Sequence, residues 1–408
     1  MDKTDDQKAK KMFGFSLAEW QRRHRKIREI MQLRDIDCLV VVGCSAKNWA
    51  YAASHVYIAG QDWVGLGDYS YVVFPLEGEP IQLQGGGTGR IRNDEDFPIP
   101  KIFDVVFKKK KGEGQRIKDY AWGIVQSIKE FGLEKGTIGI VDMRVMPAGV
   151  YMEILRELPH AKIVPAGDIL LEVRRIKSDE ELEYVHKAAE CADKGAEAMI
   201  EEASRSGATL ASIKRACRLG MLKAGASAVD FAIVTLAPWE ERMHISKYIM
   251  DQDRKVQKGD LIFNEICPNY NGSFVQGCYP ISVGVEEKDM PDSFREVFSL
   301  HKDIYELARV EMKPGNTIAN IEKKINKFAS AHGKFGKVWT MQLSEMGEDH
   351  YKLNNAELRP RMVYNNHPNV NPADSVPGYR GIMIGNALIV TEGEPEVTSR
   401  RPLELAVA

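Results

Sequence analysis

The segment Gln61–Tyr69 places an aromatic ring among carboxylates, a combination that suits a positively charged ligand. Trp63 lies in it between Asp62 and Asp68. The face of an indole attracts a cation and a carboxylate pairs with the same charge, so both effects can act on one ammonium group. Trp63 and Asp68 are therefore candidate substrate-binding residues. The alternative is a loop in which Trp63 packs at an interface and the acids face water.

Thiols are a second group of residues that could do chemistry. The chain has six cysteines, and no two of them have the Cys-x-x-Cys spacing that is typical of zinc and redox motifs. We expect them to be reduced. Cys267 and Cys278 are predicted on the two strands of one hairpin, where a thiol nucleophile would need a neighbouring base and a lowered pKa. A buried, inert cysteine is the alternative at both positions.

Composition excludes several classes of function. Lys and Arg number 56 against 58 Asp and Glu, a net charge of −2, which gives no field for holding nucleic acid. The longest apolar runs, such as Cys38–Val42, are far shorter than the roughly 20 residues that span a bilayer, so no membrane association is expected. Met1–Asp6 has no apolar core after it, which predicts a cytoplasmic protein without a secretory signal. Gly85–Gly87 lacks the spacing of a phosphate-binding loop.

Hydrophobic patterning predicts an N-terminal α/β domain over 16–168, after a tail at 1–15. An amphipathic helix begins at Ser16, and short apolar runs alternate with helical stretches after it. Strands are predicted at Cys38–Val42, Tyr69–Phe74, Pro80–Gln84, Ile102–Phe107 and Thr137–Val141, with helices at 115–131 and 147–157.

The remainder, 169–408, is predicted to be an α+β domain. The apolar residues before Ile176 are expected to end a strand, and Ser178 with Glu181 forms a capping box that begins a long helix. Helices are predicted at 179–204, 209–224, 291–312 and 317–332, and strands at 231–236, 260–267, 277–283 and 386–391.

Three local matches make the chain similar to the creatinase/prolidase/aminopeptidase P superfamily. Arg174–Glu181 looks like the Arg-x-Ile-Lys-Ser-x-x-Glu segment that begins its C-terminal domain. Lys258–Val285, with Tyr270-Asn271-Gly272 inside it, looks like the segment with the first two metal-binding aspartates, and Ala387–Gly393 looks like the final strand. The resemblance covers nearly the whole chain. It implies an α/β N-terminal domain plus an α+β pita-bread C-terminal domain.

The metal-binding positions of this superfamily are changed here. The two aspartate positions fall on Glu265 and Gln276, which keep the spacing (276 − 265 = 11), while two glutamate positions fall on His367 and Gly385. The Gly-His-x-x-Gly segment is absent. An amide and a glycine cannot supply the charge that paired divalent ions need, so the sequence predicts no metal and no cofactor. A single metal on Glu265, His367 and a nearby cysteine stays a formal alternative.

Creatinase, within the superfamily, hydrolyses a guanidino C–N bond without a metal. The resemblance implies a histidine that acts as general acid and base ahead of the Lys-Gly-Asp turn. The candidate is His244, although it lies 16 residues before Asp260 (260 − 244 = 16), about four more than the usual register. An imidazole suits the role because its pKa of about 6.5 lets it exchange a proton near neutral pH. A purely structural histidine is the alternative.

The resemblance also bears on substrate binding. Creatinase binds a carboxylate with arginines, and the loop Gln61–Tyr69 has none, so creatine is not the expected substrate. Cys278 falls where creatinase has a substrate-contacting glutamate. Arg380 resembles the arginine ahead of the final motif and is either an anion anchor or part of a salt bridge. Glu345 and His350 follow the missing histidine motif and either line the cleft or belong to a solvated loop.

Together these features predict a metal-independent, creatinase-like hydrolase that cleaves a C–N bond of a small polar, non-peptide metabolite. His244 would shuttle the proton, Glu265 would orient it or hold a cationic group, and His367 would stabilise or protonate the reacting centre. A lyase that abstracts a proton is one alternative, and a catalytically inactive binding protein is another. A homodimer is expected, in which the N-terminal domain closes on the partner's cleft.

Overall fold

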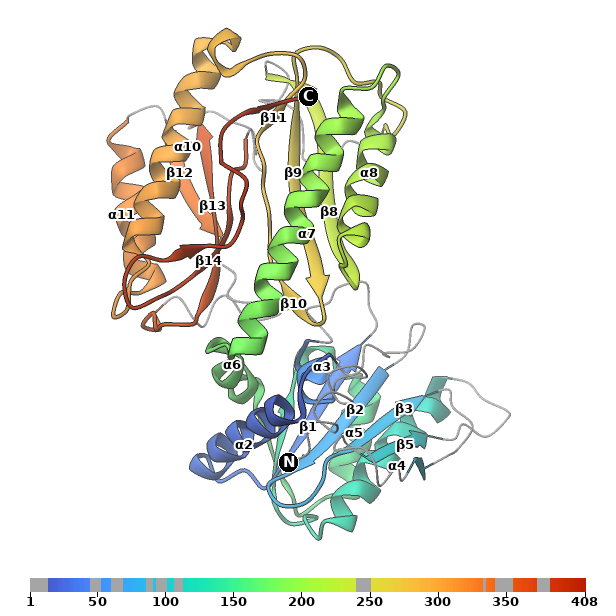
Figure 1. The fold of residues 1–408 in the computed structure, drawn as a ribbon. Helices are drawn as coiled ribbons and strands as arrows, with labels where there is room; N and C mark the ends of the chain where they lie inside the picture. Colours follow the sequence, from blue (N-terminus) through green and yellow to red (C-terminus); the bar gives the residue numbers. More distant parts are fainter. Residues whose placement is uncertain are drawn as a thin grey trace. The chain divides into compact units, whose positions relative to one another are not determined.

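The computed structural model describes residues 14–44, 53–59, 69–85, 91–92, 101–105, 113–239, 251–332, 335–341, 355–372 and 382–408. The chain forms two compact units, Met1–Arg174 and Arg175–Ala408 (Figure 1). Six residues singled out in the sequence lie outside the described ranges: Trp63, Asp68, His244, Glu345, His350 and Arg380.

The first unit is built on a mixed sheet in which β1 (Cys38–Cys44) is an inner strand. β1 runs parallel to β6 (Thr137–Val141) and antiparallel to β2 (Tyr69–Pro75). The other elements are β3 (Ile81–Gly85), β4 (Ile91–Arg92), β5 (Lys101–Val105), β7 (Lys162–Pro165), α2 (Leu17–Leu33), α3 (Ala53–Ala59), α4 (Glu113–Glu130), η2 (Met143–Val145), α5 (Ala148–Glu157) and α6 (Gly167–Arg175). The described strands follow the order β4-β5-β3-β2-β1-β6-β7.

Helices cover both faces of this sheet, which explains why β1 is apolar throughout. Val40 packs in a cluster with residues of α4 and α5, and Val41 packs in another with residues of α2, α3 and α6. A strand that is buried on both faces has no polar alternation. The helix expected from Ser16 is present as α2, and the Ser16 hydroxyl caps it by accepting a hydrogen bond from Glu19 N at 3.2 Å.

The second unit contains two connected sheets. The first is formed by β8 (Ala228–Pro238), β9 (Asp260–Tyr270), β10 (Ser273–Phe274), β11 (Ile281–Ser282) and β16 (Ala406–Val407). The second is formed by β12 (Phe335–Met341), β13 (Val363–Pro372), β14 (Asn386–Ile389) and β15 (Glu396–Val397). Each sheet is backed by a pair of helices (Figure 1).

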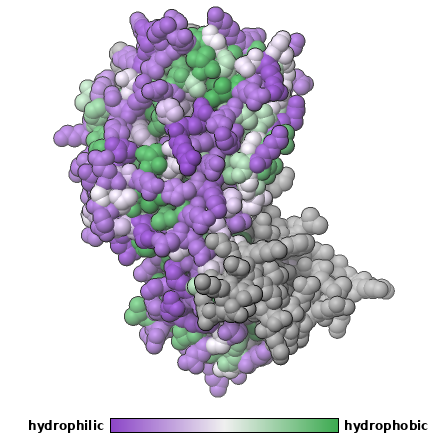
Figure 2. Space-filling model, in the orientation of Figure 1, coloured by the Kyte–Doolittle hydropathy of each residue, from purple (hydrophilic) through white to green (hydrophobic). Residues whose placement is uncertain are grey.

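The helices of the second unit are α7 (Asp179–Ala203), α8 (Leu210–Lys223), α10 (Asp292–Glu311) and α11 (Ile318–Ser330), with the short η3 (Glu287–Asp289). α7 and α8 contact β9 and β8, and α10 and α11 contact β13 and β12. The capping box of Ser178 and Glu181 is present at the start of α7. The face of this unit seen in Figure 2 is mostly hydrophilic with small apolar areas. Among the described helices, none is both long and apolar enough to cross a membrane.

Two secondary-structure predictions were wrong. The apolar residues before Ile176 belong to helix α6 rather than a strand, because Ile169, Leu170 and Val173 lie on one buried helical face. The strand expected over 277–283 is regular only at β11, since Gly277 and Cys278 each make an isolated bridge to a different neighbour.

Candidate functional site

Glu265 and Cys278 face each other across the central hairpin of the second unit. Ile262 pairs with Ile281 and Ile266 bridges Gly277. Continuing this antiparallel register puts Cys278 directly opposite Glu265, with both side chains on one face of the sheet.

Asn264 fixes that register from the adjacent position. Its Oδ1 accepts a hydrogen bond from Tyr279 N at 2.9 Å, and its Nδ2 donates to Tyr279 O at 2.5 Å. Tyr279 is anchored in turn, because its hydroxyl donates to Asp193 Oδ1 at 2.7 Å. One side chain therefore satisfies both backbone groups of Tyr279 and holds the two strand segments at a fixed offset.

Gly385 connects this hairpin to His367. Cys278 and Gly385 exchange two backbone hydrogen bonds of 2.9 Å, so the hairpin adjoins the second sheet here. A Cβ atom at Gly385 would lie 2.2 Å from Asn366 O and 2.4 Å from His367 Cβ. These distances are too short for any side chain, since Asn366 O and His367 Cβ belong to the neighbouring strand β13. The last metal-binding position of the superfamily thus has neither a side chain nor room for one.

A second row of side chains runs beside the first. The same register puts Gln276 opposite Cys267, and Asn365 pairs with Ala387 on β14. Gln276 joins the two rows: its Nε2 donates to Glu265 Oε1, and its backbone N–H donates to Asn365 Oδ1 at 3.2 Å. Asn365 and His367 are two residues apart on β13, so their side chains share one face.

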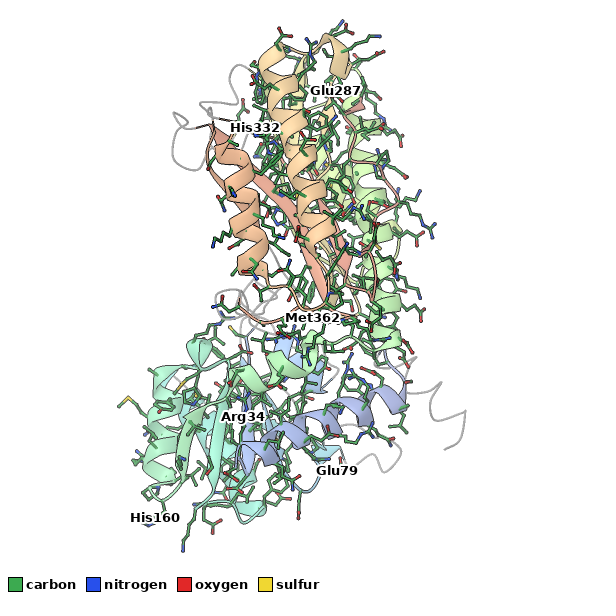
Figure 3. The ribbon with its side chains drawn as sticks, turned by 90° about the vertical axis from the view of Figure 1, so that its left-hand side faces the viewer. Arg34, Glu79, His160, Glu287, His332 and Met362 are labelled. Carbon is green, nitrogen blue, oxygen red and sulfur yellow. The ribbon has the colours of Figure 1, made fainter. Side chains whose placement is uncertain are left out.

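The outer side of β13 and β14 holds a buried polar contact with α10. Asn366 Nδ2 donates to Tyr305 O at 2.9 Å, and the Tyr305 hydroxyl donates to Asn386 Oδ1 at 2.7 Å. Burial raises the pKa of Tyr305 above its ordinary value, so the hydroxyl stays a donor. Figure 3 labels Met362, which immediately precedes β13 and marks where this strand begins. The hydrogen bonds that Asn366 and Asn386 make with Tyr305 hold the strand segment that carries His367.

The described donor set does not fit a pair of divalent cations. Glu265 is 4% exposed, and Gln276, which occupies the second aspartate position, offers it an N–H rather than a second charge. His367 and Gly385 replace two further carboxylates. In the part of the chain that the structure describes, no three His, Cys, Asp or Glu residues are arranged to hold a metal ion. Hard divalent ions need several charged oxygens, and this arrangement supplies one carboxylate.

Among the predicted site residues, the structure thus places Glu265, Cys278 and His367 on connected strand segments. Cys278 is fully buried and packs with Phe263 and Met383. Apolar surroundings disfavour a thiolate, so this environment favours the inert cysteine over the nucleophile.

Sequence reasoning missed the contributions of Gln276 and Asn365. The sequence identifies Gln276 only as a lost metal ligand, whereas the structure shows it as the hydrogen-bonding partner of Glu265. Asn365 was not a candidate, although its position two residues before His367 on a predicted strand is a signal that both face the same way.

Comparisons with known proteins agree with this architecture. Residues 23–176 match the family described as Creatinase/Prolidase N-terminal domain, and residues 183–392 match Metallopeptidase family M24. A Xaa-Pro dipeptidase of Pyrococcus horikoshii is 21% identical over 93% of this chain and 97% of its own length. A creatinase of a Bacillus species is 20% identical over 95% of this chain and 92% of its own length. The crystal structure of X-Pro aminopeptidase from Thermotoga maritima superposes with a TM-score of 0.73 at 19% identity, covering 94% of this chain and 99% of the other.

These matches confirm the resemblance and the fold class predicted from the sequence. The N-terminal unit is the creatinase-type α/β domain, and the C-terminal unit has the pita-bread fold. The chain belongs to metallopeptidase family M24 and carries the creatinase/prolidase N-terminal domain.

Proposed function

We propose that this protein is a metal-independent hydrolase that cleaves a C–N bond of a small polar, non-peptide metabolite. The observation that carries the proposal is the hydrogen bond from Gln276 Nε2 to Glu265 Oε1. It joins the two positions that hold metal-binding aspartates in the superfamily. Two aspartates at these positions repel each other unless a metal lies between them, whereas an amide and a carboxylate attract each other directly. The similarity to a creatinase supports a non-peptide substrate.

The roles follow from the chemistry of the side chains. Cleaving a C–N bond with water requires a proton for the departing nitrogen and a base for the attacking water. His367 is proposed to transfer these protons, because an imidazole exchanges protons near neutral pH. Glu265 is proposed to orient the substrate by binding one of the substrate's nitrogen groups. His244, outside the described residues, stays a second candidate for the proton shuttle.

Turnover in ¹⁸O-labelled water tests this proposal. The purified chain is incubated with a metabolite extract, and products are followed by mass spectrometry. A hydrolase gives products whose summed mass exceeds the substrate by one labelled water, and His367→Gln and Glu265→Gln should each abolish the change. Products whose masses sum to the substrate would show a lyase instead. An unchanged extract would favour a catalytically inactive binding protein.

We also propose a homodimer in which the segment Gln61–Tyr69 completes the partner's site through Trp63 and Asp68. Light scattering of the purified chain tests the oligomeric state. Mixing Trp63→Ala with His367→Gln chains tests the shared site, because only a mixed dimer has one intact site and regains activity. A monomer, or no recovery after subunit exchange, would contradict this arrangement.

A further inference from the structure

Two amide side chains in the site have orientations that their partners determine. The Glu265 carboxylate accepts hydrogen bonds, so the NH₂ group of Gln276 must face it and the Gln276 carbonyl must point elsewhere. The backbone N–H of Gln276 can only donate, so Oδ1 of Asn365 must face it and the Asn365 NH₂ group must point away. The usual ambiguity between oxygen and nitrogen in an amide is thereby resolved at both positions.

Each amide retains one unused hydrogen-bonding group. Gln276 Oε1 is buried and has no hydrogen-bond partner among the residues that the structure describes. Within the same part of the chain, Asn365 Nδ2 donates to no residue, although Asn365 is only 3% exposed. Leaving a buried polar group such as Gln276 Oε1 unbonded is destabilising, so a bound molecule that donates a hydrogen bond to it gains an energetic advantage, and Asn365 Nδ2 is free to donate to the same molecule.

The residues beside Gln276 and Asn365 at β14 are small. Ala387 pairs with Asn365 on β14, and its methyl group lets the Asn365 side chain reach Gln276 N at 3.2 Å. Gly385, in the adjacent row, has no side chain at all. The face therefore presents an amide oxygen from one sheet and an amide NH₂ from the other, with Glu265 beside the first.

We propose that Gln276 and Asn365 determine substrate specificity by binding a carboxamide or ureido group. The N–H of that group donates to Gln276 Oε1, and its carbonyl oxygen accepts from Asn365 Nδ2. This inference rests on the proposed function and names the substrate class of the same site. A guanidinium carries only N–H donors and would set them against the Asn365 donors, whereas a carboxylate carries only acceptors and would oppose Gln276 Oε1 and Glu265.

N-carbamoylglycine and guanidinoacetate test the proposal as a matched pair of probes, because they share the same carboxylate tail and differ where a neutral carbonyl oxygen replaces an NH₂ group of the cationic guanidinium. Their affinities for the intact chain are measured by calorimetry, without any turnover. N-carbamoylglycine should bind about tenfold or more tightly than guanidinoacetate, since a site built around a hydrogen bond rejects the analogue that cannot make it. Equal affinities, a preference for guanidinoacetate, or binding of neither at millimolar concentration would overturn the assignment.

Asn365→Asp separates a binding role from a structural one. An aspartate keeps an acceptor for Gln276 N, but it replaces the NH₂ donor with a second acceptor. The preference between the two probes should reverse, and the unfolding temperature should fall because the variant buries a second carboxylate near Glu265. Asn269→Asp is the control, because Asn269 Oδ1 likewise accepts a backbone N–H, from Gly272 at 2.8 Å, at the hairpin turn. An unaltered preference in Asn365→Asp would show that Asn365 only holds the strands together.

The outcome is independent of whether the reaction proposal is correct. If the probes bind as expected but no metabolite gains water, the role of Gln276 and Asn365 in specificity is supported and the hydrolase proposal is wrong. If hydrolysis is found with a substrate that has no amide or ureido group, the hydrolase proposal is supported and the role of Gln276 and Asn365 in specificity is wrong.

Discussion

Gln276 donates a side-chain hydrogen bond to Glu265, across the eleven positions that separate two metal-binding aspartates in related enzymes. Two carboxylates at these positions would repel each other unless a cation lay between them. An amide and a carboxylate attract each other without any cation. This pair therefore supports a site that has been rebuilt around hydrogen bonds.

Restoring a carboxylate at residue 276 should destabilise the fold. In Gln276→Glu, two buried carboxyl groups share one site, and the pKa of the introduced carboxyl rises above its unfolded value. The folded state then binds more protons than the unfolded state, so the loss of stability grows as pH rises from about 4 towards neutrality. Urea unfolding at pH 5 and pH 8 measures this dependence. A variant equally stable at both values would show that a cation neutralises the pair.

Introducing a side chain at residue 385 should also destabilise the fold. Gly385→Ala places Cβ 2.2 Å from Asn366 O, so β13 must move away, at a cost of about 1–3 kcal/mol in the free energy of unfolding. Gly393→Ala is the matched control, because its Cβ would meet no atom closer than 4.0 Å. Denaturant unfolding compares the two. Equal stabilities would mean that His367 does not lie against Gly385 as described.

Asn264 should make a large contribution to the free energy of unfolding through its two hydrogen bonds to the backbone of Tyr279. Asn264→Ala leaves the backbone N–H and C=O of Tyr279 without their partner, and each buried group left unsatisfied costs about 1–3 kcal/mol. Asn264→Asp keeps the acceptor but sets a buried carboxylate oxygen against the Tyr279 carbonyl, so it should destabilise at least as much as the alanine variant. Urea unfolding gives the order of the three chains. A loss below about 0.5 kcal/mol for the alanine variant would indicate that water replaces the side chain.

Acid should destabilise the protein through buried histidines. Burial lowers the pKa of His24, His55 and His301 from 6.5 to about 4. As pH falls below about 6.5 the unfolded state takes up protons that the folded state refuses, so stability is full above that pH and declines towards pH 4. His301→Gln should reduce the slope of unfolding free energy against pH, whereas His160→Gln, at an exposed position labelled in Figure 3, should leave it unchanged. Identical slopes in all three chains would contradict this origin.

Much of the fold could be predicted from the sequence because local signals agree with tertiary packing. The capping box at Ser178 and the apolar periodicity of α7 are local features, and the structure confirms both. The residues before Ile176 were misassigned because a short apolar run is compatible with a strand or with a buried helical face. Only contacts made in three dimensions, such as those of Ile169 with its cluster, distinguish the two.

The site was accessible to sequence reasoning in part. The resemblance to the superfamily placed Glu265, Gln276, His367 and Gly385 at related positions, and the strand pairings connect them. The direction in which each amide points was not accessible, because it depends on Glu265 for Gln276 and on a backbone N–H for Asn365. Such partners are set by strand register, which a linear sequence does not display.

Elemental analysis of the purified chain, combined with an activity assay before and after chelation, tests metal independence most directly. We expect a transition-metal content far below one ion per chain and turnover that survives the chelator. One or more tightly held ions per chain, with activity lost on chelation and regained when the metal is returned, would contradict it.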